Sequence, residues 1–402
     1  MKIKNIKILE NKMLKNIEIS FENNDKILDT IVIAGVNGSG KTTLLESIYY
    51  GIEDIINNKK KRAVLTFEFE ENEKKGLTQA SGKRDFFYRL NTYSFYEKNL
   101  DKIFDDKEFY SKIKPFPKII YIPAEIKFED VKTLTTNLKR EYKFLNIIDN
   151  TIIKDIPSYI ASRITYIANT EENLTMKQAK EKVNDEINGI FNILDVDIRL
   201  KGVSKDETST PIFINSSGEE FDINGLSSGE KQLFLRTLSI KMLEPENSII
   251  LIDEPELSLH PKWQQRIIKV YEKIGRNNQI IVATHSPHIL GSVPKENIIM
   301  LSKNEVGKII PIPEEKLENS YGQPVNRILE DLMGLETTRN IEVFNLLEEV
   351  RELVRNGKYQ EKIFKEKYEK LENILGRTDT DLLLIDMEIQ RKKREIKNAE
   401  NR

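Results

Sequence analysis

The chain has 402 residues, in which 63 lysines and arginines nearly balance 65 aspartates and glutamates, and it contains no cysteine. The balanced charge excludes a uniformly basic surface, so any polyanion site must be a local patch, and the lack of cysteine excludes disulfides and thiolate metal sites. No run approaches the ~18 apolar residues of a membrane span, and the start, MKIKNIKILENK, has no apolar signal segment, so we expect a soluble cytoplasmic protein without a membrane partner.

The first part of the chain predicts strands around one strong helix. Ile17, Ile19 and Phe21 alternate with polar residues, as in a strand with one buried face. Residues 30–35, TIVIAG, are apolar on both faces, as in a strand inside an α/β sheet, and LLESIYYGIEDII follows with helical spacing. Further strands are predicted at residues 2–9, 63–71 and 118–125, the second of them in an antiparallel layer.

The middle and the end of the chain carry mostly helical signals. One apolar stripe is formed by Val183, Ile187, Ile190, Phe191 and Leu194, and no seven-residue repeat lasts long enough for a long coiled coil. Residues 211–223 predict a hairpin that turns at residues 216–218, and SIILIDEPE, QIIVATHSPHIL and NIIML predict three more strands. We divide the chain into residues 1–126, 127–195, 196–318 and 319–402, the last part being helical.

Residues 35–42, GVNGSGKT, match the P-loop pattern, and they lie between a buried strand and a helix as that mechanism requires. The glycines allow backbone N–H groups to surround phosphates, while Lys41 reaches the β- and γ-phosphates as a catalytic group and Thr42 places its hydroxyl on Mg²⁺. The pattern predicts an ATP site built from Gly35, Asn37, Gly38, Ser39, Gly40, Lys41, Thr42 and Thr43.

The segment SIILIDE is an apolar strand that ends in two acids. Such an ending is common in parallel sheets, but beside a P-loop it predicts that Asp253 holds Mg²⁺ and that Glu254 polarises the attacking water. His285, at the end of the strand in VATHSP, is expected to sense the γ-phosphate and steady that water. His260 and His288 are expected to be ordinary hydrogen-bonding residues, and no set of His, Asp and Glu has the spacing of a zinc site.

A second Gly/Ser loop, NGLSSGEKQ at residues 224–232, lies far from the P-loop along the chain. It opens a helix that Leu233, Leu235, Leu238 and Ile240 predict to be amphipathic. The N-terminus of a helix opened by such a loop attracts anions, because its N–H groups are unpaired and the helix dipole is positive there. The loop therefore predicts a second anion-binding element.

The order of P-loop, LSSGEKQ, ILIDEPE and THS resembles that of the ABC-class ATPases. The variant EPELSLHPKWQ, residues 254–264, resembles the SMC/Rad50/RecF branch, and most of all its small defence-associated members of the Septu PtuA-like and OLD types. The resemblance covers residues 1 to about 302. It implies an α/β fold, with a two-lobed ATPase head in which an antiparallel β layer lies beside a RecA-like core, a short helical insertion, and an α-helical C-terminal region.

The resemblance also implies a shared site. Ser228 and Gly229, with Ser227 and Glu230 beside them, are expected to contact the γ-phosphate of ATP held by another subunit, so that ATP joins two copies into a homodimer. Whether such dimers form a higher assembly stays open. We call residues 224–232 the signature loop. A site shared between two copies would explain why this loop lies so far along the chain from the P-loop. One departure is that no glutamine follows the strand KIIYIPAE, and we assign no role to Glu125, the nearest polar residue.

Three functions stay open beyond ATP binding and slow hydrolysis. The first is a sensor or regulatory subunit of an antiphage-type defence complex, the second a DNA-repair ATPase that acts on DNA, and the third a transporter subunit, which the more than 180 residues between Lys41 and Leu226 disfavour. OLD-type nucleases carry an acidic Toprim signature after the histidine motif, and none follows Asn297 here, so we expect a separate effector, an HNH-type nuclease bound through the C-terminal helices. The basic runs at residues 59–62 and 391–394 make DNA a possible partner, although solvated charge is their ordinary explanation.

Overall fold

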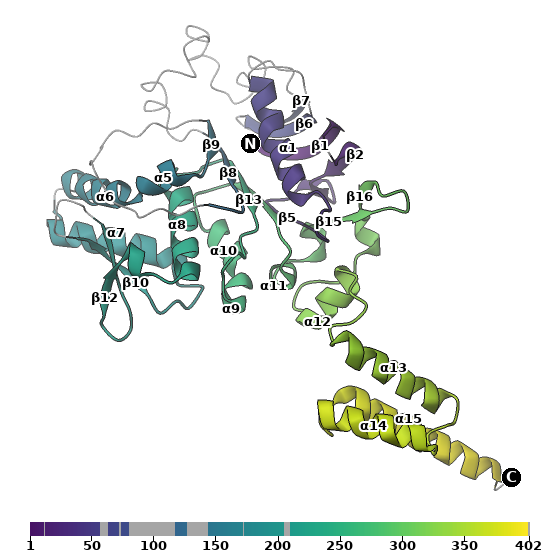
Figure 1. Cartoon of the computed structure of the whole chain (residues 1–402). Helices are drawn as coiled ribbons and strands as arrows, with labels where there is room; N and C mark the ends of the chain where they lie inside the picture. Colours follow the sequence, from purple (N-terminus) through teal and green to yellow (C-terminus); the bar gives the residue numbers. More distant parts are fainter. Residues whose placement is uncertain are drawn as a thin grey trace. The chain divides into compact units, whose positions relative to one another are not determined.

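The computed structural model of the chain describes residues 1–11, 13–56, 63–71, 74–79, 117–126, 144–171, 173–204 and 210–400 (Figure 1). The basic run at 59–62 and residues 127–143 of the expected insertion lie outside these ranges. The chain forms two compact units, Met1–Ile328 and Leu329–Arg402. Within the described residues, no helix has the length and low charge needed to cross a bilayer.

A seven-stranded sheet forms the core of the first unit, in the order β16-β15-β5-β14-β13-β8-β9. The strands are β5 (Thr30–Gly35), β8 (Ile119–Ile122), β9 (Leu145–Ile147), β13 (Ile249–Asp253), β14 (Gln279–Ala283), β15 (Ile298–Lys303) and β16 (Ile309–Pro311). All neighbours are parallel except β15 and β16. Every residue of β5, β8, β13 and β14 is buried, which explains why their sequences are apolar on both faces.

An antiparallel sheet of order β2-β1-β6-β7 makes the second layer, with β1 (Lys2–Glu10), β2 (Lys15–Ser20), β6 (Ala63–Glu71) and β7 (Lys74–Gln79), and a short β3 (Glu22–Asn23) and β4 (Lys26–Ile27) pair nearby. Helix α1 (Lys41–Ile56) shares one apolar core with both sheets. The fully buried amide of Gln279 on β14 accepts from Ile3 N at 2.7 Å and donates to Ile3 O at 2.9 Å. These layers confirm the predicted two-lobed α/β head.

A helical lobe contains α5 (Asn150–Lys154), α6 (Ile156–Thr170), α7 (Met176–Phe191) and α8 (Ser228–Met242), with a small sheet of β10 (Arg199–Val203), β11 (Pro211–Ile214) and β12 (Glu220–Asp222). The predicted stripe on α7 is buried, and the hairpin of β11 and β12 is confirmed. The prediction of an amphipathic α8 was wrong. Residues 233–240 are buried on every side because α8 lies inside the lobe, where Phe234 packs on Phe191 and Phe213.

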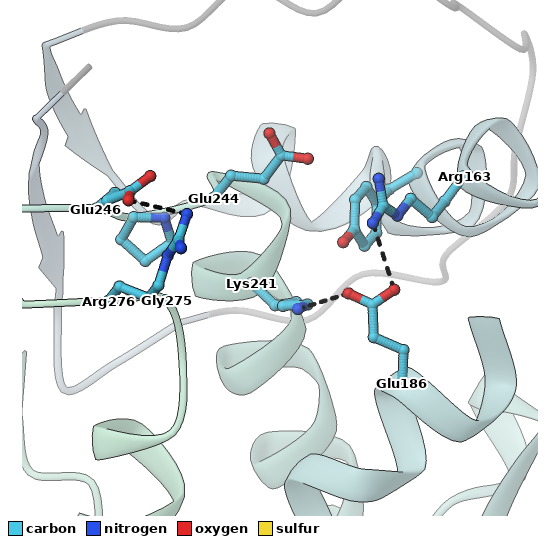
Figure 2. Close-up of a pocket in the computed structure, with 9 residues that line it drawn as sticks. Arg163, Glu186, Lys241, Glu244, Glu246, Gly275 and Arg276 are labelled. Carbon is cyan, nitrogen blue, oxygen red and sulfur yellow. Dashed lines mark hydrogen bonds and ion pairs between the residues drawn. The ribbon is translucent and has the colours of Figure 1, made fainter. Parts of the chain in front are cut away.

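Ion pairs line a pocket between the helical lobe and the amino ends of β13 and β14 (Figure 2). Glu186 of α7 lies between Lys241 of α8, at 2.7 Å, and Arg163 of α6, at 3.5 Å. Arg276 and Glu246, which precede β14 and β13, form a pair at 3.0 Å. All these groups are partly exposed, so each pair contributes at most about 1 kcal/mol. Every one of these cations therefore already has a carboxylate partner.

Short helices follow the core strands, namely α9 (Pro261–Gln264), α10 (Ile267–Glu272), α11 (Pro287–Leu290) and α12 (Val325–Arg327), with a π-helical turn at Ile328–Leu332. Three further turns, of the 3-10 type, lie at Ile223–Gly225, Lys295–Asn297 and Glu314–Lys316. The second unit contains α13 (Ile341–Arg355), α14 (Lys362–Leu375) and α15 (Thr380–Glu400) around a core that includes Leu347, Val350, Leu371 and Leu382. This confirms the predicted helical C-terminal region, with turns at Gly357 and Gly376.

Candidate functional site

Three predicted segments meet at one edge of the central sheet. The P-loop follows β5, Asp253 ends β13, and His285 follows β14, and these strands are neighbours in the order β5-β14-β13. Because neighbouring parallel strands end at the same edge, their polar endings are brought together although more than 200 residues separate the first from the second. This is the position at which open α/β sheets bind their ligands.

The P-loop has a backbone that only glycine can adopt at two tight places. Gly35 has φ +149°, and a Cβ there would lie 2.4 Å from Leu301 O; Gly40 has φ +85° and packs against Leu14 and Ile309. Lys41 begins α1, is almost fully buried, and donates through Nζ to the carbonyls of Gly35 at 2.9 Å and Val36 at 3.2 Å. Burial lowers the pKa of Lys41, although Glu254 and Asp253 oppose this. Lys41 is thus held inside the P-loop, where the phosphates are predicted to bind.

The P-loop also has a polar group without a partner that suits a bound phosphate. Ser39 is fully buried, yet its Oγ atom has no hydrogen-bond partner within the described residues. Gly38 has φ +72° and nothing within 4 Å of where a Cβ would be, and Asn37 beside it is exposed. Thr43 is half-buried, and its carbonyl accepts from Ser47 Oγ. A buried polar atom without a partner is costly, so an acceptor such as a phosphate oxygen suits this position.

Thr42 and Asp253 form the oxygen pair expected for Mg²⁺. Thr42 Oγ1 donates to Asp253 Oδ1 at 3.2 Å, and Asp253 is almost completely buried. Burial raises the pKa of Asp253 to about 6, while the hydrogen bond from Thr42 works in the opposite direction and Glu254 adds to the rise. Both side chains offer hard oxygen ligands, which Mg²⁺ prefers, and a cation there would relieve the buried carboxylate of its cost.

Glu254 occupies a strained turn directly after β13. Its φ is +44°, a left-handed value that is uncommon for residues other than glycine, and its N–H donates to Ala283 O at 2.9 Å. Strain of this kind is found where surrounding structure fixes a functional side chain. Glu254 Oε1 lies 3.6 Å from His285 Nε2, and burial together with Lys41 lowers the pKa of His285. The imidazole is therefore neutral at pH 7. It lies beside Glu254, the carboxylate that the sequence predicts to polarise the attacking water.

A third acid in the same turn, Glu256, was missed by sequence reasoning. Its Oε1 accepts from Thr284 Oγ1 at 2.7 Å and from His285 N at 2.6 Å, while its Oε2 atom is buried without a partner in the described residues. Burial raises the pKa of Glu256. The carboxylate fixes the backbone that carries His285. The signal in the sequence was the repetition of acids in DEPE, which places a second Glu two residues beyond the first.

The signature loop is built as the start of α8. Ser227 caps the helix by accepting from Glu230 N, and Glu230 Oε2 accepts from Ser227 N at 2.9 Å and from Ser227 Oγ at 2.7 Å, a reciprocal capping box. Gly229 is buried, and a Cβ there would lie 2.5 Å from Ser258 O, so this glycine allows the PELSLH loop to approach. Ser228 is exposed. Among the described residues, no hydrogen bond or ion pair joins residues 227–230 to the P-loop.

Arg236 links α8 to the strand ends and was also missed. Its guanidinium is buried, and the side chain is 2% exposed. It donates to main-chain carbonyls on two segments: to Asp253 O and Glu254 O at the end of β13, each at 3.3 Å, and to Pro123 O and Ala124 O after β8, the first at 3.1 Å. Burial lowers its pKa. The segment after β8 is where the resemblance to ABC-class ATPases led us to expect a glutamine. Here Glu125 is exposed, and a buried arginine from α8 contacts this segment instead.

The remaining polar candidates are His260, His288 and the basic run at residues 391–394, and each lies on or at the start of a helix outside the strand ends described above. His260 caps α9, and its Nδ1 accepts from Lys262 N at 3.2 Å. His288 is the second residue of α11, and its N–H donates to the helix cap Ser286 Oγ at 3.2 Å. The run at 391–394 lies on α15, where Arg391 faces Glu395 at 3.8 Å and Lys392 donates to Arg355 O. These contacts agree with solvated helix charge for that run.

Comparisons with known proteins agree with this geometry. Residues 31–291, from the P-loop strand to α11, match the model of a family described as "AAA domain, putative AbiEii toxin, Type IV TA system". The chain is 29% identical to the Septu protein PtuA of Bacillus thuringiensis over 86% of this chain and 88% of that protein, and 23% identical to the Retron Vc95 probable ATPase of Vibrio cholerae serotype O1 biovar El Tor over 89% and 84%.

Among solved structures, an SMC head bound to the C-winged helix domain of ScpA aligns with a TM-score of 0.44 and 14% identity, over 78% of this chain and 97% of that one. The family model covers more than half of the chain and includes the P-loop, the signature loop and the acids of the β13 turn. The chain therefore belongs to this family of AAA domains, and it is a P-loop ATPase related to defence-associated ATPases.

Proposed function

We propose that the protein binds ATP between two copies of itself, with Lys41 of one copy and Ser228 of the other on the same triphosphate. The observation that carries this proposal is the placement of the signature loop. Ser228 is exposed at the positive end of α8, and residues 227–230 have no bond to the P-loop of their own chain in the described residues. A second copy can supply the missing half of the site.

In this proposal, hydrolysis is the attack of water on the γ-phosphorus, which forms a new P–O bond, breaks the bond to the β–γ bridging oxygen, and leaves ADP and phosphate. Glu254 accepts the proton of the water, and neutral His285 orients it. Mg²⁺ held by Thr42 and Asp253 would neutralise phosphate charge. Turnover is slow because the site is complete only in the dimer. Loss of the γ-phosphate then removes the contact that joins the copies.

We further propose that ATP-dependent dimerisation regulates a separate effector nuclease of the HNH type in a defence complex. Similarity to the Septu protein PtuA over most of both chains supports the defence role. The C-terminal unit supports a docking role, because α15 exposes Leu383, Leu384 and Met387 next to one another on its surface, while Leu382 and Ile385 fill its core. The chain alone is expected to cut no nucleic acid.

The shared site is tested with Glu254→Gln, which should bind ATP without hydrolysing it. Light scattering with ATP and Mg²⁺ should then show twice the monomer mass. Adding Ser228→Arg should return the monomer mass, because the long cation blocks the approach of the second copy, whereas Ser216→Arg at the exposed β11–β12 turn should leave the dimer intact. An unchanged mass in Glu254→Gln and in both double variants would refute the shared site.

The effector is tested by co-expressing the chain with an HNH-type nuclease encoded in the neighbouring reading frame. Leu384→Glu should abolish co-purification while the rate of ATP hydrolysis stays the same, because the change is confined to α15. Lys393→Glu, an exposed change on the same helix, is the matched control. Retention of the nuclease by Leu384→Glu, or DNA cleavage by the chain alone, would contradict this part.

A further inference from the structure

A second pocket of the first unit lies outside the ATP site. It has a volume of about 380 Å³ and is formed by the α9–α10 segment, by α11 and by residues 321–325. Backbone and side-chain bonds hold the last segment on α11: Gly322 N donates to Gly291 O at 3.0 Å, and Ser320 Oγ donates to Val293 O at 2.6 Å. The walls are therefore fixed parts of the fold. The volume is in the range of sites for small ligands.

The two charged side chains that line this pocket, Arg266 and Lys269, are both basic. His288 also lines it, and no carboxylate does so within the described residues. Lys269 is exposed and has no ion pair or hydrogen bond from its ammonium group in that part of the chain, and Arg266 spends one donor on Ile193 O at 2.9 Å. In the pocket of Figure 2, by contrast, Lys241, Arg163 and Arg276 each face a glutamate. The difference favours an anionic ligand here.

His288 adds an observation of another kind. Its Nδ1 atom is buried and has no hydrogen-bond partner among the described residues, although the backbone N–H of the same residue is satisfied by Ser286 Oγ. Buried polar atoms without partners are rare because each costs free energy. Because this atom has almost no exposed surface, the ring has to turn before its Nδ1–H can donate a hydrogen bond to an oxygen of an anionic ligand in the pocket, and the same ligand would pair with the two cations.

The rim of the pocket carries an aromatic ring. Tyr321 is 62% exposed, which is unusual for a large ring in a segment whose neighbours Ser320 and Gly322 are anchored to the fold. Flat exposed rings next to cationic side chains are the combination with which proteins hold nucleotides, because the ring stacks on a base while the cations neutralise its phosphate. Gln323 lines the same pocket and offers amide groups.

We propose that this pocket binds a nucleotide, with its phosphate on Arg266, Lys269 and His288 and its base on Tyr321. The nucleotide is either free or the phosphorylated end of a nucleic-acid strand, since both present the same groups. Gln264, beside the pocket, donates to Leu259 O at 2.8 Å in the PELSLH loop and accepts from Ser286 Oγ at 2.7 Å. These two bonds connect the surroundings of the pocket to the loop that packs on Gly229 and to the segment that follows His285.

The test uses the full chain with Lys41→Ala, so that the ATP site is disabled, and titration calorimetry with two probes. The probes are adenosine 5′-monophosphate and a 5′-phosphorylated oligothymidylate of four nucleotides. One site per chain is expected. Lys269→Glu should weaken binding about tenfold, as loss and reversal of one phosphate contact does. Lys273→Glu, the same change at an exposed position one turn further along and outside the pocket, should alter it less than twofold.

Equal affinity for the two probes identifies the free nucleotide as the ligand, and tighter binding of the oligonucleotide identifies the strand end. Tyr321→Leu should weaken both probes but leave inorganic phosphate binding unchanged. The proposal is overturned if neither probe binds, or if Lys269→Glu and Lys273→Glu reduce the affinity equally, which would indicate unspecific attraction by surface charge. Either result leaves the dimer experiment on Glu254→Gln unaffected.

Discussion

Asp253→Asn should make the nucleotide-free protein more stable while it abolishes hydrolysis. Burial raises the pKa of Asp253 from 3.8 to about 6, so the folded chain prefers the protonated form. A raised carboxyl pKa lowers stability as the pH rises through the interval between the two values: the folded state has its full stability below 3.8 and loses it by about pH 6. The two values differ by an amount worth about 3 kcal/mol at 25 °C. Asparagine keeps the acceptor for Thr42 and removes the buried charge.

The measurement is urea unfolding without Mg²⁺ or nucleotide, followed by fluorescence. The chain has one tryptophan, Trp263 on α9, so the signal reports the first unit and not the C-terminal helices. At pH 8 the variant should gain up to about 3 kcal/mol in the free energy of unfolding, reduced by whatever attraction Asp253 has to Arg236. At pH 5 the gain should fall to about half, because the wild-type carboxyl is then largely protonated.

Other titrating groups are the same in both proteins and cancel in this difference. The reasoning is refuted if the variant is less stable than the wild type at pH 8, or if the difference between them stays constant from pH 5 to pH 8. Persistence of Mg²⁺-dependent hydrolysis in the variant would separately refute the assignment of Asp253 to the metal. The experiment thus tests the burial of the charge and its use independently.

Two further substitutions test how α8 communicates with the site. Arg236→Met should lower kcat for ATP hydrolysis at least tenfold, because the carbonyls at the ends of β8 and β13 lose the donor that they share. The ATP affinity measured by calorimetry should change little, and Arg236→Lys should restore part of the rate. An unchanged kcat in Arg236→Met would contradict this reasoning. Gly229→Ala should weaken ATP-dependent dimerisation in the Glu254→Gln background, since its Cβ would lie 2.5 Å from Ser258 O. The control is Gly189→Ala on α7, where a Cβ meets nothing within 4 Å, and this change should leave the stability of the fold equal or higher. Equal dimerisation by the two variants would exclude a role for the contact with Ser258.

Sequence reasoning located the strands that end at the site because their signal is local. Residues 30–35 and 249–253 are apolar on both faces, and the polar residues that follow them have to lie at one sheet edge. The antiparallel layer and the C-terminal helices were predictable for the same reason, as their periodicities of two and of three to four residues match the burial found along β2 and α13.

What escaped prediction depends on contacts between distant segments. Arg236 within LFLRTLSI looks like the polar face of an amphipathic helix, and only the packing of α8 inside the lobe shows that it is buried against two strand ends. Glu256 has no periodic signal, because its partners Thr284 and His285 lie in the segment that follows β14, the neighbouring strand of the sheet. The roles assigned to Ser228 and Glu254 stay predictions, since they concern a second copy and a bound nucleotide.

The Arg236 contact has a consequence for which positions can vary. Four main-chain oxygens receive this side chain, and every amino acid has such an oxygen. The identities of residues 123 and 124 are therefore free to change as long as the path of the peptide chain is kept, and the loop after β8 needs no specialised amide there. On the signature helix the connection depends on the Arg236 side chain, whose Nε also donates to Gln232 Oε1 at 3.0 Å.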